Sequence, residues 1–188
     1  MKTLLSFDDV ILVPQYSEIE SRGTVDTSTI LKVKSGNHIK LDVPLISSPM
    51  PAVTETMMAY HMYLNGGLAI LHRFNTIEQQ VQMVKDFFEL VNRPLGELYG
   101  VDPVIGAAVG INGDYLERVN ALISYGVRVI CVDVAHGYHK TVANAAINIA
   151  KQLPDDIHLM VGNIGDVKGY KYLNSLECIS GCRLGISG

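Results

Sequence analysis

The chain has 188 residues, 48% of them hydrophobic and 18% charged, which excludes a disordered segment and fits one globular domain of ordinary size. A formal net charge of −4 without basic runs argues against nucleic acid as a partner. No run of about 18 apolar residues is present, so no membrane span is expected. Asp8 and Asp9 interrupt the apolar run near the N-terminus, which is unlike a signal peptide.

The cysteines are Cys131, Cys178 and Cys182, an odd number without a disulfide pattern, which is typical of a reducing cytosol. We therefore expect a cytoplasmic protein. Cys178 and Cys182 lie four residues apart, but a zinc site would need more ligands near them, and the pair His136 and His139 is read as residues without a special role. We expect no metal site, and we expect thiols that belong to the core or the surface.

Six short apolar runs divide the chain and predict strands at residues 44–49, 68–71, 104–109, 127–133, 157–162 and 182–187. Helical patterns lie between several of them. Thr76 and Gln79 form a capping box that predicts the start of one helix, and Asp114 with Glu117 can cap a second. A third apolar stripe covers residues 142–153. Helices that alternate with continuous apolar strands predict a parallel sheet in an α/β fold.

Two parallel architectures fit this alternation, a doubly wound open sheet and a (β/α)8 TIM barrel. A doubly wound dinucleotide-binding sheet needs a glycine-rich turn after its first strand, and here that turn reads SSPMPAVTE. The strands instead share polar residues or glycines at their C-terminal ends, namely Ser47-Ser48, His72-Arg73, Gly110, Asp133, Gly162-Asn163 and Gly185. A barrel builds its active site at those ends, so we predict an incomplete TIM barrel with about six βα units.

Asp133 is the most informative of these residues. It closes the apolar run VRVICVD, where burying a charge without a partner is costly. An acid in this place either caps the helix that follows or holds a ligand, and the two roles can be combined.

Several motifs, in the same order along the whole chain, resemble the IMP dehydrogenase/GMP reductase family: FDDVILVP, SRGTVDTST, LISSPMPAVTE, GGLAILHRFNTIEQQV, IGAAVG, VDVAHGY, VGNI and RLGISG. The resemblance implies a (β/α)8 barrel that usually assembles as a tetramer. Many family members carry a regulatory CBS pair between the second helix and the third strand. Here the loop NRPLGELYGVDP (92–103) stands in that place and is too short for one. Residues 1–188 are therefore expected to be the N-terminal part of one catalytic barrel, without a CBS domain.

The resemblance also implies roles for individual residues. Asp133 matches the acid that binds the nicotinamide ribose of NAD, whose two hydroxyls a carboxylate can accept at once. Gly185, Ile186 and Ser187 match the start of the catalytic loop, which touches nicotinamide and supplies carbonyls to a monovalent cation, K+ in the complete enzyme. The purine nucleotide, IMP or GMP, is matched by Ser48, Met50 and Asn163. Without the resemblance, Met50 would be read as a core residue and Asn163 as a turn residue.

Two positions depart from the family pattern. Pro51-Ala52 stand where the family usually has Asp-Thr, which weakens the expectation of polar contacts in the first loop. Ser187 replaces the second glycine of the catalytic loop's GxG, a substitution that matters if the position needs a positive φ.

The family's nucleophile is a cysteine a few residues into the loop that begins at RLGISG, and no residue here matches it. Cys182 precedes that loop, so no catalytic residue is assigned, and the chain alone is expected to be inactive. Three hypotheses remain: an IMP dehydrogenase-like enzyme that oxidises IMP to XMP with NAD, a GMP reductase that uses NADPH, and a non-catalytic or split product that needs a C-terminal partner fragment. The first is favoured.

Overall fold

The structure is a computed structural model that describes residues 7–92 and 102–186. Its centre is a parallel sheet of β3 (Ile46–Ser47), β4 (Leu68–Leu71), β5 (Gly106–Val109), β6 (Val129–Asp133), β7 (His158–Ile164) and β8 (Gly181–Leu184). The strands lie side by side in chain order, each parallel to the next. A doubly wound sheet reverses its order at a switch point, whereas a barrel does not.

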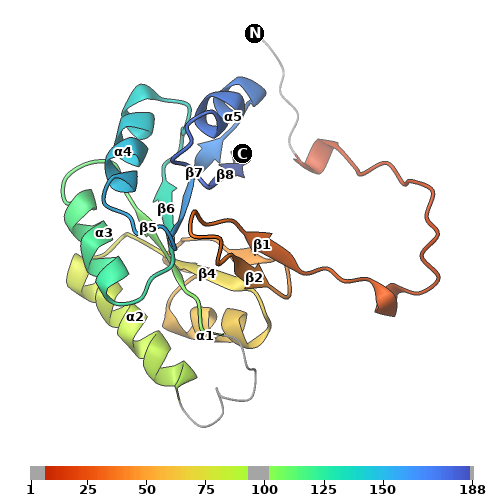
Figure 1. Ribbon diagram of the computed structural model, residues 1–188, viewed down its shortest axis with the longest axis horizontal. Helices are drawn as coiled ribbons and strands as arrows, with labels where there is room; N and C mark the ends of the chain where they lie inside the picture. The colour runs from red at the N-terminus through yellow and green to blue at the C-terminus, as the bar shows by residue number, and fades with distance from the viewer. Residues whose placement is uncertain (1–6, 93–101, 187–188) are drawn as a thin grey trace.

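Helices connect consecutive strands and cover the outer side of the curled sheet (Figure 1). They are α1 (Thr56–Leu64), α2 (Ile77–Val91), α3 (Tyr115–Ser124), α4 (Lys140–Ala150) and α5 (Val167–Asn174). This is a half-barrel of the (β/α)8 type, so the predicted α/β fold with an incomplete TIM barrel is confirmed. The predicted strands are all present, but the first is shorter than residues 44–49, the third is shorter than residues 104–109, and the last ends at Leu184 and not at residue 187.

Side chains alternate along each strand between the two faces of the sheet, and both faces are buried. Leu71, Val109 and Val132 point outward and join the core formed with the helices. The residues beside them point into the barrel lumen, where one from each of four neighbouring strands forms a packed layer, namely Ile70, Ala108, Cys131 and Met160. These side chains form the floor of the open half-barrel, and Ile70 and Met160 also line a cavity above it.

A β-hairpin closes the N-terminal end of the lumen. Its strands, β1 (Thr29–Leu31) and β2 (Ile39–Leu41), pair antiparallel. Ile39 and Leu41 pack against Leu68 and Val129, at the starts of β4 and β6. The sequence analysis did not predict this hairpin.

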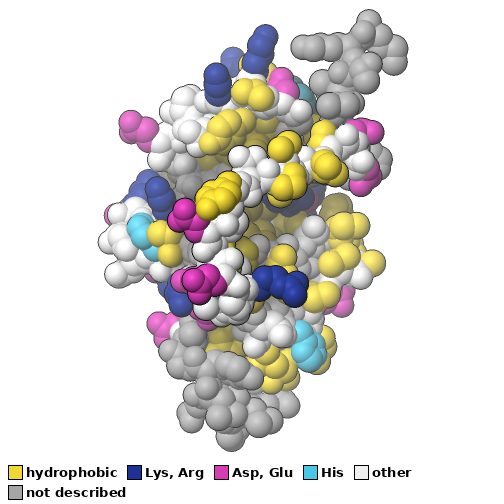
Figure 2. Space-filling model, turned by 90° about the vertical axis from the view of Figure 1, so that its right-hand side faces the viewer, with side chains coloured by type: hydrophobic (Ala, Val, Ile, Leu, Met, Phe, Trp, Pro, Cys, Tyr) yellow, Lys and Arg dark blue, Asp and Glu magenta, His cyan; other side chains and the backbone are white. Residues whose placement is uncertain are grey.

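Before the hairpin, the chain runs as an extended arm between two short 3-10 helices, Phe7–Asp9 and Arg22–Thr24, and away from the body of the molecule (Figure 1). Hydrophobic side chains gather along it in the view from that side (Figure 2), and Ile11 and Leu12 are 88% and 96% exposed.

The two predicted helix caps had different outcomes. The capping box of α2 is confirmed, because Thr76 Oγ1 accepts from the Gln79 amide and Gln79 Oε1 accepts from the Thr76 amide. The cap predicted for α3 is wrong, because the Asp114 side chain makes no capping bond and instead pairs with Arg118 at 3.3 Å. Most of loop 92–103 and all of Ser187 lie outside the described residues, so the expectations about them are untested.

Candidate functional site

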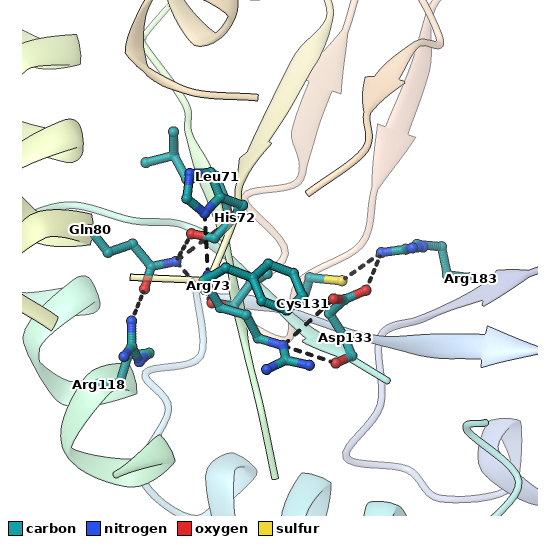
Figure 3. A network of polar contacts seen from close by, with 10 residues as sticks. Leu71, His72, Arg73, Gln80, Arg118, Cys131, Asp133 and Arg183 are labelled. Carbon is teal, nitrogen blue, oxygen red and sulfur yellow. Dashed lines mark hydrogen bonds and ion pairs between the residues drawn. The ribbon is translucent and has the colours of Figure 1, made fainter. Parts of the chain in front are cut away.

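Asp133 is the last residue of β6 and lies between two arginines (Figure 3). Its Oδ1 accepts a hydrogen bond from Arg183 Nη1 at 3.0 Å, and its Oδ2 lies 3.6 Å from Arg73 Nε. Arg73 Nε also donates to the Asp133 main-chain carbonyl at 3.2 Å. The side chain is only 16% exposed, and the two guanidinium groups compensate the buried charge.

Asp133 does not cap the following helix, so that alternative interpretation is wrong. The residue before α4 is His139, whose Nδ1 accepts from the Thr141 amide at 3.2 Å. Asp133 instead lies at the C-terminal rim of the barrel, at the strand end where barrel enzymes bind their ligands.

A pocket of about 580 Å³ opens across the half-barrel from β3 to β8. We call it the rim pocket, and its lining includes Ser48, Asn163, Arg183, Gly185 and Ile186, with Ile70, Met160 and Cys182 from inside the lumen. Residues predicted from distant parts of the sequence thus lie around one cavity, and Arg183 connects it to Asp133.

Met50 does not share this arrangement. It is 54% exposed, so the core interpretation is wrong, and it is absent from the residues that line the rim pocket. Its amide nevertheless donates to the carbonyl of Ser48 at 2.8 Å, so Met50 lies beside a residue that does line the pocket.

Asn163 holds an unused hydrogen-bond acceptor. Its main chain is fixed, with the amide donating to Val134 and the carbonyl accepting from Gly137, and the Gly162–Asn163 peptide is cis. Its side-chain Oδ1 is buried without a hydrogen-bond partner in the part of the chain that the structure describes. A buried polar atom of this kind needs an explanation, and a ligand donor in the rim pocket would supply one.

The strand ends pack closely around Arg183. A Cβ atom at Gly162 would lie 2.6 Å from the Arg183 carbonyl oxygen, so only glycine fits on β7 at this point. Gly185 follows β8 with φ of 103°, a conformation that favours glycine and turns the chain at the rim. Close packing therefore fixes the position from which Arg183 reaches Asp133.

A buried polar network supports the segment that carries Arg73 (Figure 3). Gln80 Nε2, on α2, donates to the carbonyls of His72 at 3.0 Å and Ala108 at 2.9 Å. Arg118, on α3, donates to Gln80 Oε1 at 2.9 Å and so fixes the amide orientation. Two helices thereby hold the ends of β4 and β5 in place.

The sequence analysis assigned no role to Arg73, Arg183, Gln80 or Arg118. A signal for the first two was available, because an acid buried at a strand end requires a cationic partner. The arginines of HRF and CRLG lie at the C-terminal ends of β4 and β8, each two strands away from β6.

The thiols in and beside the rim pocket are poor nucleophiles. Burial raises the pKa of Cys131 to about 11 and also raises the pKa of Cys182. Because the thiolate is the reactive form, neither residue is suited to covalent catalysis near neutral pH. Across residues 7–92 and 102–186, no three or more His, Cys, Asp or Glu residues are grouped to hold a metal ion, and no helix is long and apolar enough to cross a membrane.

These features define a (β/α)-barrel protein with its candidate ligand site at the carboxyl ends of the strands. The model of the IMP dehydrogenase / GMP reductase domain matches residues 4–188, and the chain belongs to this family.

Relatives carry both family names. The chain is 26% identical to an inosine-5′-monophosphate dehydrogenase of Nitrosopumilus maritimus, over 88% of this chain and 57% of that protein. It is 44% identical to a GMP reductase of Leishmania donovani over 81 residues, which are 43% of this chain and 16% of that protein. The crystal structure of inosine 5′-monophosphate dehydrogenase from Legionella pneumophila matches with a TM-score of 0.77 and 33% identity, over 98% of this chain and 51% of that one. The chain thus spans about half the length of the relatives that it matches along most of its own length.

Proposed function

We propose that residues 1–188 act as the N-terminal part of the catalytic barrel of an IMP dehydrogenase-like oxidoreductase, without a CBS domain, that converts IMP to XMP with NAD. The observation that carries the proposal is the meeting of Ser48, Asn163, Gly185 and Ile186 around one pocket, beside the compensated acid Asp133.

The residues present fit a nicotinamide dinucleotide. Each oxygen of the Asp133 carboxylate faces one arginine nitrogen. Each oxygen therefore keeps a lone pair that can accept a hydrogen bond from a ribose hydroxyl. Gly185, Ile186 and Ser187 would contact the nicotinamide, and when bound this group accepts the hydride. Among these three, Ser187 lies outside the described residues.

The purine nucleotide would use the other side of the rim pocket. Ser48 follows β3 and offers a hydroxyl, while the unpaired Asn163 Oδ1 offers an acceptor. Met50, half-exposed in the same loop as Ser48, would pack on the base.

The proposal requires residues that these strands do not supply. The raised pKa values of Cys131 and Cys182 do not suit a catalytic nucleophile. Within the described chain, β3 and β8 are the edges of the sheet, because each pairs with a single neighbouring strand. We therefore include in the proposal a C-terminal partner segment that supplies the last two βα units, the reactive thiol and the remaining ligands of K+. Its assembly would be a homo-oligomer of complete barrels.

A GMP reductase, which would use GMP and NADPH, is the second candidate. The 44% identity to the Leishmania donovani GMP reductase favours it, but only over 81 residues. The matches that cover most of this chain include several IMP dehydrogenases and also a GMP reductase, so coverage does not separate the two candidates.

One experiment tests both candidates and the need for a partner. The purified protein is assayed with IMP plus NAD and with GMP plus NADPH, alone and with a fragment that supplies the last two βα units. We expect turnover of IMP only in the mixture. Turnover by the protein alone would contradict the need for a partner. A mixture that is inactive with both pairs and binds neither nucleotide would contradict the proposed function.

A further inference from the structure

The guanidinium group of Arg73 is only partly used. Both of its contacts with Asp133 run through Nε, and within the described residues neither Nη1 nor Nη2 makes a hydrogen bond or an ion pair. Arginine–carboxylate pairs are frequently bidentate, with two nitrogens of the guanidinium facing the two oxygens. Arg73 instead contacts Asp133 through Nε alone, which leaves Nη1 and Nη2 available to bind a ligand.

The charges around Asp133 do not balance. Asp133 carries one negative charge, whereas its two partners Arg183 and Arg73, at 3.0 Å and 3.6 Å, carry two positive charges. Arg183 lines the rim pocket, whereas Arg73 is absent from that lining and is 30% exposed. The second positive charge is therefore on a partly exposed side chain outside the lining of the rim pocket.

The forked end of Arg73 lies over the end of β5. Its Nη1 would be the nearest neighbour of a Cβ atom at Gly110, at 3.5 Å, and its Cζ lies 4.8 Å from the centre of the Phe74 ring. Gly110 has no side chain to obstruct a ligand that approaches between the ends of β5 and β6.

The main chain on both sides of Arg73 is fixed. Gln80 Nε2 donates to the carbonyl of His72 at 3.0 Å, and the amide of Phe74 donates to His72 Nδ1 at 3.2 Å. Because the anchors are in place before any ligand arrives, binding at the free end loses little conformational entropy.

We propose that the free edge of Arg73 binds the phosphate that follows the nicotinamide ribose of a dinucleotide held by Asp133. The inference rests on the proposed function, because it places the ribose at Asp133. The 5′-phosphate projects from the same sugar ring, and a free guanidinium fork matches phosphate oxygens in shape and charge. Arg73 thus distinguishes phosphorylated ligands from the bare nucleoside.

The test compares nicotinamide mononucleotide with nicotinamide riboside, which lacks the phosphate. Equilibrium dissociation constants are measured for the wild-type protein, Arg73→Gln and Arg73→Lys. Arg128→Gln is the matched control, because Arg128 is 27% exposed, has a carboxylate at 3.9 Å, and precedes β6 at the opposite rim. The readout is the ratio of the two dissociation constants, which isolates the contribution of the phosphate.

We expect the wild-type protein and Arg128→Gln to prefer the mononucleotide by about tenfold or more, and Arg73→Gln to lose this preference, with partial rescue by Arg73→Lys. An unchanged preference in Arg73→Gln would overturn the inference. If Asp133→Ala weakens both ligands and Arg73→Gln weakens neither, the proposed function stands and this inference fails. If the wild-type protein binds neither ligand, the proposed function fails, and the inference fails with it.

Discussion

Asp133 and Arg183 are 50 residues apart in the chain, yet Oδ1 of the first lies 3.0 Å from Nη1 of the second. They come from β6 and β8, and β7 runs between these strands. Gly162, on β7, leaves room for Arg183 to reach across it. The contact therefore depends on the curvature and register of three strands. A substitution that shifts any of these strands should alter the distance between Asp133 and Arg183.

Replacing Asp133 by alanine should weaken dinucleotide binding more than binding of the purine nucleotide. The loss of charge-assisted hydrogen bonds predicts a cost of about 1.5–3 kcal/mol in the binding free energy of NAD. Titrations of NAD and IMP measure the two effects separately. Asp156→Ala is the control, since Asp156 faces Arg128 at 3.9 Å and is 51% exposed. An unchanged affinity for NAD in Asp133→Ala would remove this residue from the cofactor site.

Replacing Gly162 by alanine should separate β7 from β8. The added Cβ would lie 2.6 Å from the Arg183 carbonyl oxygen, which is main chain and cannot move aside alone. Overpacking of this kind costs about 1–3 kcal/mol in the free energy of unfolding. Urea denaturation measures it, with Gly23→Ala as the control, because a Cβ at Gly23 meets its nearest atom at 3.7 Å. Equal stability of the two variants would contradict the close approach.

The sequence predicted the barrel because its signals are local. Short, continuous apolar runs rich in β-branched residues, such as residues 127–133, favour strands buried on both faces, and polar or glycine residues at their ends indicate the rim. The hairpin of residues 29–41 had a usable signal that was missed. Its buried residues alternate around the turn Ser35-Gly36, where Gly36 has a positive φ of 84°.

The pairing of side chains was harder to predict. Arg73 and Arg183 reach Asp133 from 60 and 50 residues away, and no spacing in the sequence records which strand ends the barrel brings together. Asp114 shows the opposite difficulty. Its position just before α3 and its residue type are those of a helix cap. Arg118, four residues later on α3, binds the carboxylate instead.

Replacing Gln80 by leucine should destabilise the protein although the two side chains are similar in size. The carbonyls of His72 and Ala108 would lose a donor, and Arg118 would lose an acceptor, in a region closed to water. Each buried polar group left unpaired costs about 1–3 kcal/mol in the free energy of unfolding. Gln82→Leu is the matched control on α2, because Gln82 is exposed and bonds only to Asp86 among the described residues. The control should change stability by less than about 0.5 kcal/mol, and a similar loss in both variants would contradict the network's role.

His158 should make stability fall in mild acid. It is buried beneath the hairpin, where Nδ1 donates to the Lys32 carbonyl at 2.8 Å and Nε2 has no partner among the described residues. Burial lowers the pKa of His158 below its ordinary value of 6.5, because the charged ring would lose its hydration. The unfolded chain therefore binds a proton more readily than the folded one. The contribution to stability is complete above pH 6.5 and declines as the pH falls from there toward the folded-state pKa.

The measurement is the urea midpoint between about pH 7.5 and about pH 5.5, a window that brackets the unfolded-state pKa. Other groups titrate in this range, so the informative quantity is the difference between the wild-type protein and His158→Gln. Glutamine can still donate to the Lys32 carbonyl but does not titrate. The wild-type protein should lose more stability toward acid than this variant, whereas His61→Gln, at an exposed position on α1, should follow the wild type. Parallel pH profiles for the wild-type protein and His158→Gln would show that the buried imidazole contributes nothing to the acid sensitivity.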